Sequence, residues 1–369
     1  MKILFAYGVP HLPQVVGGLQ TNTHDLALAL IRAGHDVSVM SRLSYGNIFG
    51  IKQIARMKLA NAETIADHHL GYTVYRCRRP WDAAAAVPRP DIVVAQDGQM
   101  LEIAEAFRER GIPVVGYMHG PPQTWKYAGR PAKTADLKML GYIANSEYTA
   151  RMFRESFGLP CDIIRPLFKK ENYIVERAPK YVSFINPTRE KGVELALAVA
   201  ALLPQIPFQF VLGWPLPVKE NLALRKALAA LPNVTLHDRV TDMRRIYRMT
   251  RILLVPSQGS DNWKETWGRV ASEAHYSGIP VVGSDCGGLP EAVGVGGQVL
   301  GADEPAEKWA AAIDRLWRDE PYYAAMSRAA LDFSKRPELD SAQQVNALLG
   351  ILGHHAGKAP HPVAMRAAG

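Results

Sequence analysis

Cysteine, long apolar runs and targeting signals are scarce in this sequence of 369 residues. The three cysteines, Cys77, Cys161 and Cys286, are far apart, so no pair has metal-ligand spacing and not all of them can pair within one chain. A reducing compartment is the simplest interpretation. The apolar run after Met1 ends at Gly8, which is too early for a signal-peptide core, and no other run is long enough to span a bilayer. We therefore expect a cytoplasmic protein.

The charge balance is basic. Lysine and arginine number 43 and the acidic residues 35, which gives a net charge of +8. This balance favours an anionic ligand or surface, such as a nucleotide diphosphate or an acidic lipid headgroup at the inner face of a membrane. The alternative is a basic surface with no dedicated ligand. Nucleic acid is not expected, because the basic residues lie in scattered loops without a base-stacking motif.

The first half of the chain alternates short apolar runs with amphipathic segments, as βα repeats do. Apolar residues recur at spacings of three and four between residues 17 and 33, and Gly34 then ends the helix as a left-handed cap. We expect a parallel sheet with helices on both faces. The pattern predicts strands at 2–6, 36–41, 73–75, 92–95, 114–117 and 142–145, and helices at 17–33 and from residue 100.

The alternation restarts after a polar, aperiodic segment at 167–180, which we interpret as a linker. The fold class is therefore α/β, with two doubly wound domains and a ligand cleft between them at the carboxyl ends of the strands. The second half predicts strands at 181–185, 208–212, 234–236, 252–255 and 281–284, and helices at 193–203, 219–231, 243–249, 266–277, 307–317 and 321–333.

The domain boundaries follow from this alternation. The first domain comprises residues 1–168 and the second 178–333. Residues 334–353 are expected to form a C-terminal segment that packs back on the first domain. Residues 354–369 are rich in His, Ala and Pro, and we expect them to be a disordered tail.

The most informative stretch chemically runs from residue 256 to residue 291. A loop leads there into the helix predicted from Thr266, whose first amides lack internal partners and suit a pyrophosphate or sugar oxygens. Glu265 would precede this helix and Glu273 would lie roughly 12 Å further along the axis, at about 1.5 Å per residue. Two carboxylates so placed can bind hydroxyls at both ends of a nucleotide sugar. The alternative is a helix with two glutamates that have no such role.

This stretch resembles the retaining glycosyltransferases of the GT-B class called family 4. Their signature is Glu, seven residues and Glu, followed by Gly-x-Pro-Val and a Gly-Gly-x-x-Glu turn. The sequence has these elements at matching spacing in residues 265–273, 278–281 and 287–291. The resemblance implies two Rossmann-like domains, of which the first binds the acceptor and the second the nucleotide-sugar donor.

The resemblance also implies roles for individual residues of the stretch. Glu265 would contact the transferred sugar, and Glu273 would bind the ribose hydroxyls. The residues between them, Thr266, Trp267 and Gly268, would bind the donor, with backbone amides holding the sugar or the diphosphate. Most members of the family have Phe at the position of Trp267.

Further matches lie in the first half. Gly17 and Gly18 precede a helix, so the backbone there can approach a phosphate closely, although glycine before a helix is common. The resemblance places them in the donor and acceptor loop of the first domain. It places His119, which follows a predicted strand, near the transferred sugar. The alternative for His119 is a satisfied histidine at a strand end.

One position departs from the family pattern. Members of the family have an Arg and, five residues later, a Lys-Gly pair that neutralise the diphosphate. Here Asn186 replaces the Arg, while Lys191 is present and Arg189 stands nearby. The sequence contains no Asp-x-Asp pair, so we expect no metal and no cofactor. Stabilisation of the leaving phosphate would then fall to Lys191, to Arg189 and to helix amides.

The implied activity is a retaining, metal-independent transfer of a sugar from a nucleotide diphosphate to a hydroxyl acceptor. His119, Glu265 and Lys191 would be the catalytic residues, and none of them would act as a nucleophile. A nucleotide-sugar epimerase and an inactive binding protein stay open as alternatives; Asn186 is the best support for the latter.

The acceptor cannot be named from the sequence. Glycans, lipid-linked carriers and small molecules all fit, as do UDP, GDP and dTDP donors. Three loops place aromatic residues beside cations, which suits a sugar face or an anionic carrier; the alternative is solvated loops. These loops comprise residues 45–58, 76–81 and 125–130, and their acceptor candidates are Arg78, Trp125 and Tyr127.

Overall fold

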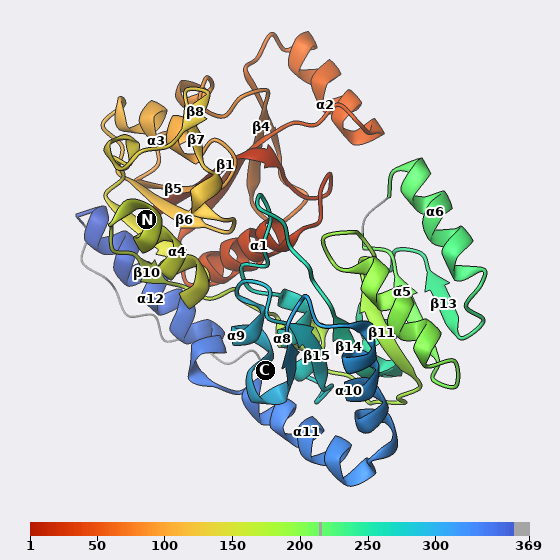
Figure 1. Ribbon diagram of the computed structural model, residues 1–369. Helices are drawn as coiled ribbons and strands as arrows, with labels where there is room; N and C mark the ends of the chain where they lie inside the picture. The colour runs from red at the N-terminus through yellow and green to blue at the C-terminus, as the bar shows by residue number, and fades with distance from the viewer. Residues whose placement is uncertain (214–215, 358–369) are drawn as a thin grey trace. The chain divides into compact units, whose positions relative to one another are not determined.

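The computed structural model describes residues 1–213 and 216–357. They form two compact units: the first unit comprises Met1–Phe168 with the described residues from Glu338 onward, and the second comprises Lys169–Pro337. Each unit is built on its own sheet, mostly parallel in the first unit and parallel in the second (Figure 1). The predicted assignment of the acceptor to the first and of the donor to the second stays a prediction.

The sheet of the first unit has the strand order β10-β9-β6-β5-β1-β2-β4-β3, and β3 is its one antiparallel strand. Its central strand β1 is almost fully buried because helices cover both faces. The strands are β1 (Lys2–Pro10), β2 (Asp36–Arg42), β3 (Thr64–Asp67), β4 (Thr73–Cys77), β5 (Ile92–Gln96), β6 (Val114–Met118), β9 (Gly141–Ala144) and β10 (Asp162–Ile163), and a separate hairpin comprises β7 (Lys126–Tyr127) and β8 (Arg130–Pro131).

Side chains of β1 alternate between the two faces of this sheet. Ile3 and Phe5 pack with helices α1 (Gly18–Arg32) and α12 (Ser341–His355), whereas Leu4 and Ala6 pack with α3 (Met100–Arg108) and α4 (Glu147–Phe157). The C-terminal helix α12 thus completes the core of the first unit. The remaining helix, α2 (Ile48–Leu59), contacts β3.

The sheet of the second unit is parallel throughout, in the order β13-β12-β11-β14-β15-β16. Val182 and Phe184 of β11 face a core that α5 and α10 close. The strands are β11 (Tyr181–Ile185), β12 (Phe208–Val211), β13 (Val234–His237), β14 (Thr250–Val255), β15 (Val281–Ser284) and β16 (Gly297–Leu300), and the helices are α5 (Val193–Leu202), α6 (Val218–Leu228), α7 (Arg244–Met249), α8 (Arg269–His275), α9 (Leu289–Val293), α10 (Ala306–Arg318) and α11 (Glu320–Phe333).

Both sheets have a point where the strand order reverses. In the first unit it lies between β1 and β5, and in the second between β11 and β14. Loops leaving the carboxyl ends of such strand pairs diverge to opposite faces and open a crevice for ligands. The fold therefore directs attention to the residues after β1, β5, β11 and β14.

Three expectations about elements were wrong. Residues 45–58 were expected to be a loop, but helix α2 begins at Ile48 within them. Helix α8 begins at Arg269 and not near Thr266, because Gly268 before it has a φ of +92°. The tail expected from residue 354 overlaps α12, which ends at His355. The rest of that tail, residues 358–369, lies outside the described residues.

Candidate functional site

Two loops leave the point of reversal in the second unit. Residues 186–192 follow β11 and carry Lys191, and residues 256–268 follow β14 and carry Ser257 and Glu265. Lys191 Nζ donates a hydrogen bond to Glu265 Oε1, and Ser257 Oγ donates to the same oxygen at 3.2 Å. The Glu265 side chain is 9% exposed and the Lys191 side chain 20%. Two of the predicted catalytic residues thus form one ion pair at the carboxyl ends of the strands, beside the point of reversal.

The surroundings fix this ion pair. Lys191 Nζ lies 4.9 Å from the centre of the Trp263 ring, and a backbone bridge to Ser260 holds Trp263 in the loop. The Glu265 carbonyl accepts a hydrogen bond from the Gly288 amide at 2.7 Å. A Cβ on Gly287 would lie 2.0 Å from that carbonyl oxygen, so the Gly-Gly turn after β15 requires glycine here. The cation is therefore placed before any ligand arrives.

Glu273, on α8, has partners of its own. Tyr247 donates to Glu273 Oε2 at 2.8 Å, and Arg269 Nε lies 3.6 Å from Oε1. Burial, and secondarily the neighbouring carboxylate, raise the pKa of Tyr247 well above its usual value, so its hydroxyl remains a donor. Because α8 starts four residues after Glu265, the separation expected from one continuous helix does not apply to the two glutamates.

The residues between the glutamates lie in different surroundings. Trp267 is buried and donates from Nε1 to Ser272 Oγ at 3.1 Å, and the Arg336 guanidinium lies 5.8 Å from its ring. This indole has a packing role that Phe could not fully replace. Gly268 caps α8, and Thr266 is half-buried in the loop before it. Their predicted contacts with the donor stay predictions.

Asn186 stands at the end of β11. Its φ is +63°, in the left-handed region, and its amide donates to the Val211 carbonyl at 2.7 Å. The residue is buried, and its side-chain Oδ1 has no hydrogen-bond partner among residues 1–213 and 216–357. Arg189, in the same loop, is exposed. The position expected to be Arg thus holds a buried amide that supplies no charge.

In the first unit, His119 immediately follows β6. Its Nε2 forms a 2.9 Å hydrogen bond with Gln96 Oε1, and its backbone amide donates to Asp97 Oδ2 at 3.0 Å. Thr23 of α1 also donates to Gln96 Oε1, at 3.1 Å. Gln96 ends β5, so these polar groups gather beside the point of reversal of the first sheet.

Two buried polar atoms of this cluster form no hydrogen bond with the described residues. Among the described residues, the buried Gln96 Nε2 and Asp97 Oδ1 have no hydrogen-bond partner. Burial raises the pKa of Asp97 to about 7, although the His119 amide opposes the shift. Unsatisfied buried polar groups are rare in folded proteins, so both atoms are candidates for contact with a ligand.

Gly17 and Gly18 open helix α1. Gly17 is its N-cap in an extended conformation and, having no side chain, makes no side-chain cap hydrogen bond. A Cβ on Gly17 would lie 2.8 Å from Gln20 Oε1. Gln20 itself is buried and donates to the Pro10 carbonyl at 2.9 Å. This arrangement ties the start of α1 to the end of β1, beside the point of reversal.

The three acceptor candidates do not come together. Trp125 stacks on Phe157 at 5.6 Å between ring centres and belongs to the margin of the core. Tyr127 lies beside the Arg130 guanidinium at 5.9 Å. Arg78 follows β4 and lines a cavity of about 380 Å³ beside α2. Since β6 and β4 are four strands apart in the sheet, at about 4.8 Å per strand, one small acceptor cannot contact all three.

Several site residues escaped the sequence analysis. Ser257 and Trp263 lie in the loop that was singled out, and Asp97 lies two residues after the predicted strand 92–95, directly after the observed β5. A polar residue after a buried strand in a doubly wound sheet is a usable signal, and it would have found Asp97 and Ser257. Nothing in the sequence pairs Tyr247 with Glu273, because 26 residues separate them and the contact depends on how α7 packs.

Residues 1–213 and 216–357 contain no group of three or more His, Cys, Asp or Glu side chains that could bind a metal ion. Within the same residues, no helix combines the length and apolar character needed to cross a membrane.

Comparison with known protein families identifies both halves. Residues 16–166 match the model of Glycosyltransferase Family 4, and residues 180–319 match that of Glycosyl transferases group 1. The chain belongs to the family 4 glycosyltransferases. These two matched ranges contain every candidate site residue named above.

Relatives within this family include the D-inositol 3-phosphate glycosyltransferase of Mycolicibacterium smegmatis, which is 30% identical over 228 residues. That match covers 58% of this chain and 46% of the relative. The D-inositol 3-phosphate glycosyltransferase of Mycobacterium marinum is 33% identical over 170 residues, with 42% of this chain and 34% of the relative covered. The chain thus matches less than half the length of these curated relatives.

Solved structures show the same fold. A glycosyltransferase from Rickettsia africae superposes with a TM-score of 0.74 at 13% identity. The match covers 97% of this chain and 99% of the Rickettsia chain. Anabaena HepE in complex with UDP-glucose superposes with a TM-score of 0.73 at 18% identity, with 96% and 100% covered. The predicted fold class, α/β with two doubly wound Rossmann-like domains of the GT-B type, is confirmed. The cleft expected between them stays a prediction.

Proposed function

We propose that this chain is a retaining, metal-independent glycosyltransferase that moves a sugar from a nucleotide diphosphate to a hydroxyl acceptor. The ion pair of Lys191 and Glu265 at the point of reversal of the second sheet carries the proposal. It combines one cation and one carboxylate at the carboxyl ends of the strands, the edge that typically binds ligands in doubly wound sheets, and this supports the proposal. Family membership supports the transfer reaction, and the HepE complex makes UDP-glucose the first donor to test.

The proposed chemistry follows from these two groups. When the bond from the anomeric carbon to the phosphate oxygen breaks, negative charge grows on the leaving diphosphate, and Lys191 stabilises it. The acceptor oxygen bonds to the same face of the anomeric carbon, and its proton passes to the leaving phosphate. Glu265 aligns the sugar hydroxyls and balances the positive charge of the ring. His119 lies in the other unit, and its role toward the transferred sugar rests on the resemblance alone.

The absence of a metal requirement is part of the proposal. It rests on the lack of an Asp-x-Asp pair in the sequence and on the cation that Lys191 supplies. The acceptor is proposed only as a hydroxyl compound. Because the curated relatives act on D-inositol 3-phosphate, that compound is one acceptor to test beside simple sugars and lipid-linked carriers.

The direct test is transfer in the presence of a chelator. The full chain is incubated with UDP-, GDP- or dTDP-hexoses, an acceptor panel and EDTA, and NMR then reports the anomeric configuration of the product. We expect acceptor-dependent release of nucleoside diphosphate with the donor's configuration retained. Glu265→Gln should abolish most turnover, whereas Glu194→Gln, an exposed residue on α5, should not change it.

Other results would reject parts of the proposal. A metal requirement would refute metal independence, and an inverted product would refute retention. Donor rearrangement without an acceptor would identify an epimerase. Nucleotide binding without turnover would identify an inactive binding protein, which the uncharged amide at Asn186 would then explain. Binding itself is detectable by thermal shift, since ligand at 100 times its Kd adds about 2.7 kcal/mol of stability.

A further inference from the structure

Helix α2 exposes large apolar side chains to solvent. Ile48 is 73% exposed, Ile51 60% and Leu59 88%. At about 100° per residue these three side chains, with the exposed Ala55 between them, fall within about 80° of the helix circumference. They therefore form one apolar stripe. Contiguous apolar surface on a soluble domain indicates a partner or a membrane, whereas isolated apolar residues do not.

Basic side chains border this stripe on both sides. Lys52 and Arg56 lie along one edge and Lys58 along the other, and all three are exposed. The helix contains no acidic residue. A helix with an apolar stripe and a basic border suits the plane of an anionic lipid surface, where the apolar side chains enter the headgroup layer. Its length of about 18 Å, at about 1.5 Å per residue, fits that orientation.

The opposite face of α2 is anchored to the first unit. Gln53 and Met57 are buried, and Asn47 caps the helix by accepting from the Gly50 amide at 2.9 Å. A Cβ on Gly50 would lie 1.8 Å from the Ser44 carbonyl oxygen, so the helix and the loop before it are in direct contact. The exposed stripe is thus one face of a packed helix.

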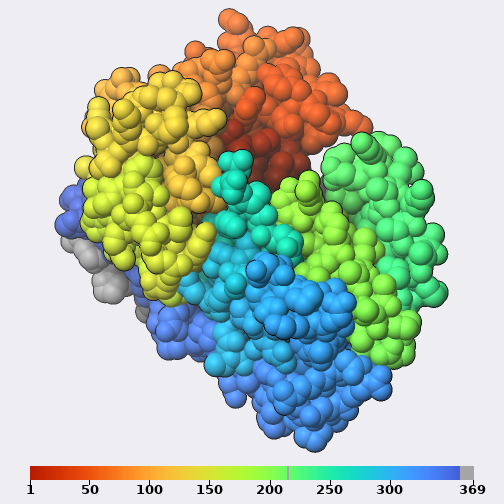
Figure 2. All heavy atoms as spheres, in the orientation of Figure 1, coloured from red at the N-terminus to blue at the C-terminus, as the bar shows by residue number. Residues whose placement is uncertain are grey.

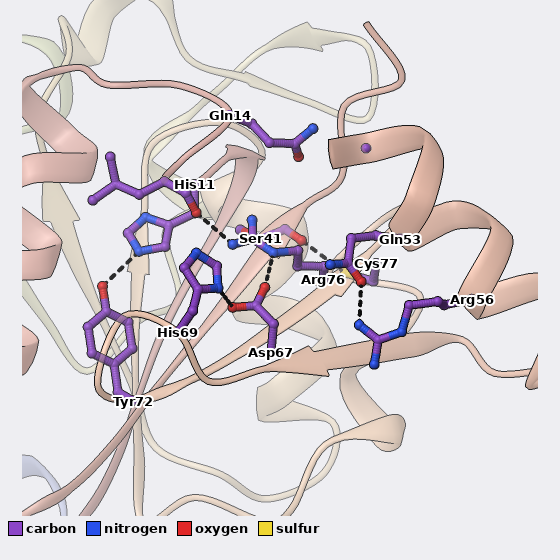
Figure 3. Close-up of polar contacts among 12 residues, drawn as sticks. His11, Gln14, Ser41, Gln53, Arg56, Asp67, His69, Tyr72, Arg76 and Cys77 are labelled. Atoms are coloured by element: carbon purple, nitrogen blue, oxygen red, sulfur yellow. Dashed lines mark hydrogen bonds and ion pairs between the residues drawn. The ribbon is translucent and has the colours of Figure 1, made fainter. Parts of the chain in front are cut away.

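A buried polar network supports the anchor (Figure 3). Arg76 of β4 is fully buried, with its guanidinium 4.7 Å from the ring of Phe49 on α2. It pairs with Asp67 and donates to the Leu12 carbonyl at 2.6 Å. Asp67 also pairs with His69 at 2.7 Å. These contacts fix α2 against the sheet, so its stripe keeps one orientation.

We infer that α2 docks the protein on an anionic lipid bilayer. Ile48, Ile51 and Leu59 enter the headgroup layer, and the lysines and the arginine contact lipid phosphates. Charge complementarity favours an anionic bilayer over other partners, because the charged residues of α2 that border the stripe are all cations. In the space-filling view, the orange segment that includes α2 lies at the surface of the first unit (Figure 2). This inference does not depend on the proposed transfer reaction.

The test is sedimentation of the full chain with vesicles. Vesicles of phosphatidylcholine alone are compared with vesicles of equal parts phosphatidylcholine and phosphatidylglycerol. We expect at least tenfold tighter binding to the anionic vesicles. Lys52→Gln with Lys58→Gln should weaken that binding about 30-fold, from about 1 kcal/mol per cation near the surface. Ile51→Ser with Leu59→Ser should weaken it roughly tenfold or more.

Helix α6 provides a matched control. Val218 and Leu222 are 78% and 64% exposed, but α6 also contains Glu220, and its Arg225 pairs with Asp238 at 3.6 Å. Val218→Ser with Leu222→Ser should leave vesicle binding unchanged. All substituted side chains are exposed, so each variant should melt as the parent does.

Three outcomes would overturn the inference. Equal binding to both vesicle types would show that charge has no role. Unchanged binding by the α2 variants would show that α2 does not contact the bilayer. Self-association of the parent chain that the α2 variants abolish, without vesicle binding, would identify a second copy as the occupant. Activity measurements are not needed for any of these results.

Discussion

Carboxylates at the carboxyl ends of the two sheets have opposite surroundings. In the second unit, Glu265 accepts hydrogen bonds from Lys191 and Ser257. In the first unit, Asp97 accepts one backbone amide at Oδ2, and its Oδ1 has no partner among the described residues. The carboxylate of the second sheet is thus charged and hydrogen-bonded. That of the first sheet, Asp97, has an unpaired oxygen and a pKa raised to about 7.

The second unit therefore holds a preorganised charge, whereas the first unit holds polar atoms that can still form hydrogen bonds. A fixed cation and its counterion suit a ligand that brings strong negative charge, because the site does not reorganise when the charge arrives. Unpaired amide and carboxyl atoms suit neutral hydroxyl groups, which both donate and accept. The following predictions test this contrast, and those that concern turnover rest on the proposed function.

The largest effect is expected from Lys191→Ala. Loss of the Lys191 cation that pairs with Glu265 should lower kcat by about 10²–10³-fold, or about 3–4 kcal/mol of transition-state stabilisation. Steady-state turnover of the nucleotide sugar measures this. Lys219→Ala, on the exposed face of α6, is the matched control. A Lys191 variant with full turnover would show that the charged site lies elsewhere.

Asp97→Asn should change the pH dependence of stability. The folded pKa of about 7 exceeds the unfolded value of about 3.9, so the folded state alone keeps the proton between these limits. Stability is therefore highest below the unfolded pKa and is lost as pH rises toward 7. Between pH 5 and pH 7 the loss is about 2–3 kcal/mol.

Urea unfolding at both pH values isolates this contribution. Other groups titrate equally in the parent and in Asp97→Asn, so only the difference between the two proteins reports on Asp97. If both lose the same stability between pH 5 and pH 7, Asp97 ionises normally and the contrast between the units fails.

Glu273→Gln should act mainly on donor binding. The substitution removes the charge that Tyr247 and Arg269 support. With it goes the charge-assisted hydrogen bond that the family resemblance predicts between Glu273 and the ribose. We expect KM for the donor to rise about tenfold, or about 1.4 kcal/mol, with kcat nearly unchanged. A fall in kcat at constant KM would instead place Glu273 at the reacting carbon.

The smallest effect is expected from Trp263→Leu. The ring lies 4.9 Å from Lys191 Nζ, and an exposed cation–π contact contributes about 0.5–1 kcal/mol. We expect kcat/KM to fall two- to fivefold, by about the same free energy. Double substitution with Lys191→Ala should add nothing further, because the contact is then already lost.

The parallel sheets could be predicted from the sequence because their strands are short, apolar and separated by amphipathic helices. Glu265 and Lys191 could be found because their motifs have fixed spacing. The start of α8 could not, since Gly268 adopts a left-handed conformation that composition does not reveal. Helix α2 was missed because apolar residues lie on both its exposed stripe and its buried face. The sequence therefore lacks the alternation of apolar and polar faces that indicates a helix.

Properties that depend on contacts between residues distant in sequence could not be predicted. The raised pKa of Asp97 could not be anticipated from the sequence, because it depends on burial and burial is a property of the packed unit. Similarly, the separation of Arg78 from Trp125 depends on the sheet order, in which β1, β2 and β5 intervene. Sequence patterns describe each strand alone, whereas the order is decided by connections between them.

Helix α12 has a consequence for biosynthesis. The chain leaves the first unit after Phe168 and rejoins it only from Glu338, where Val345 and Leu348 enter the core beside α1. A ribosome therefore finishes the whole second unit while the first still has an open apolar face. The first unit cannot close until α12 has been synthesised, so nascent chains truncated before Glu338 should be more prone to aggregate than chains that include α12.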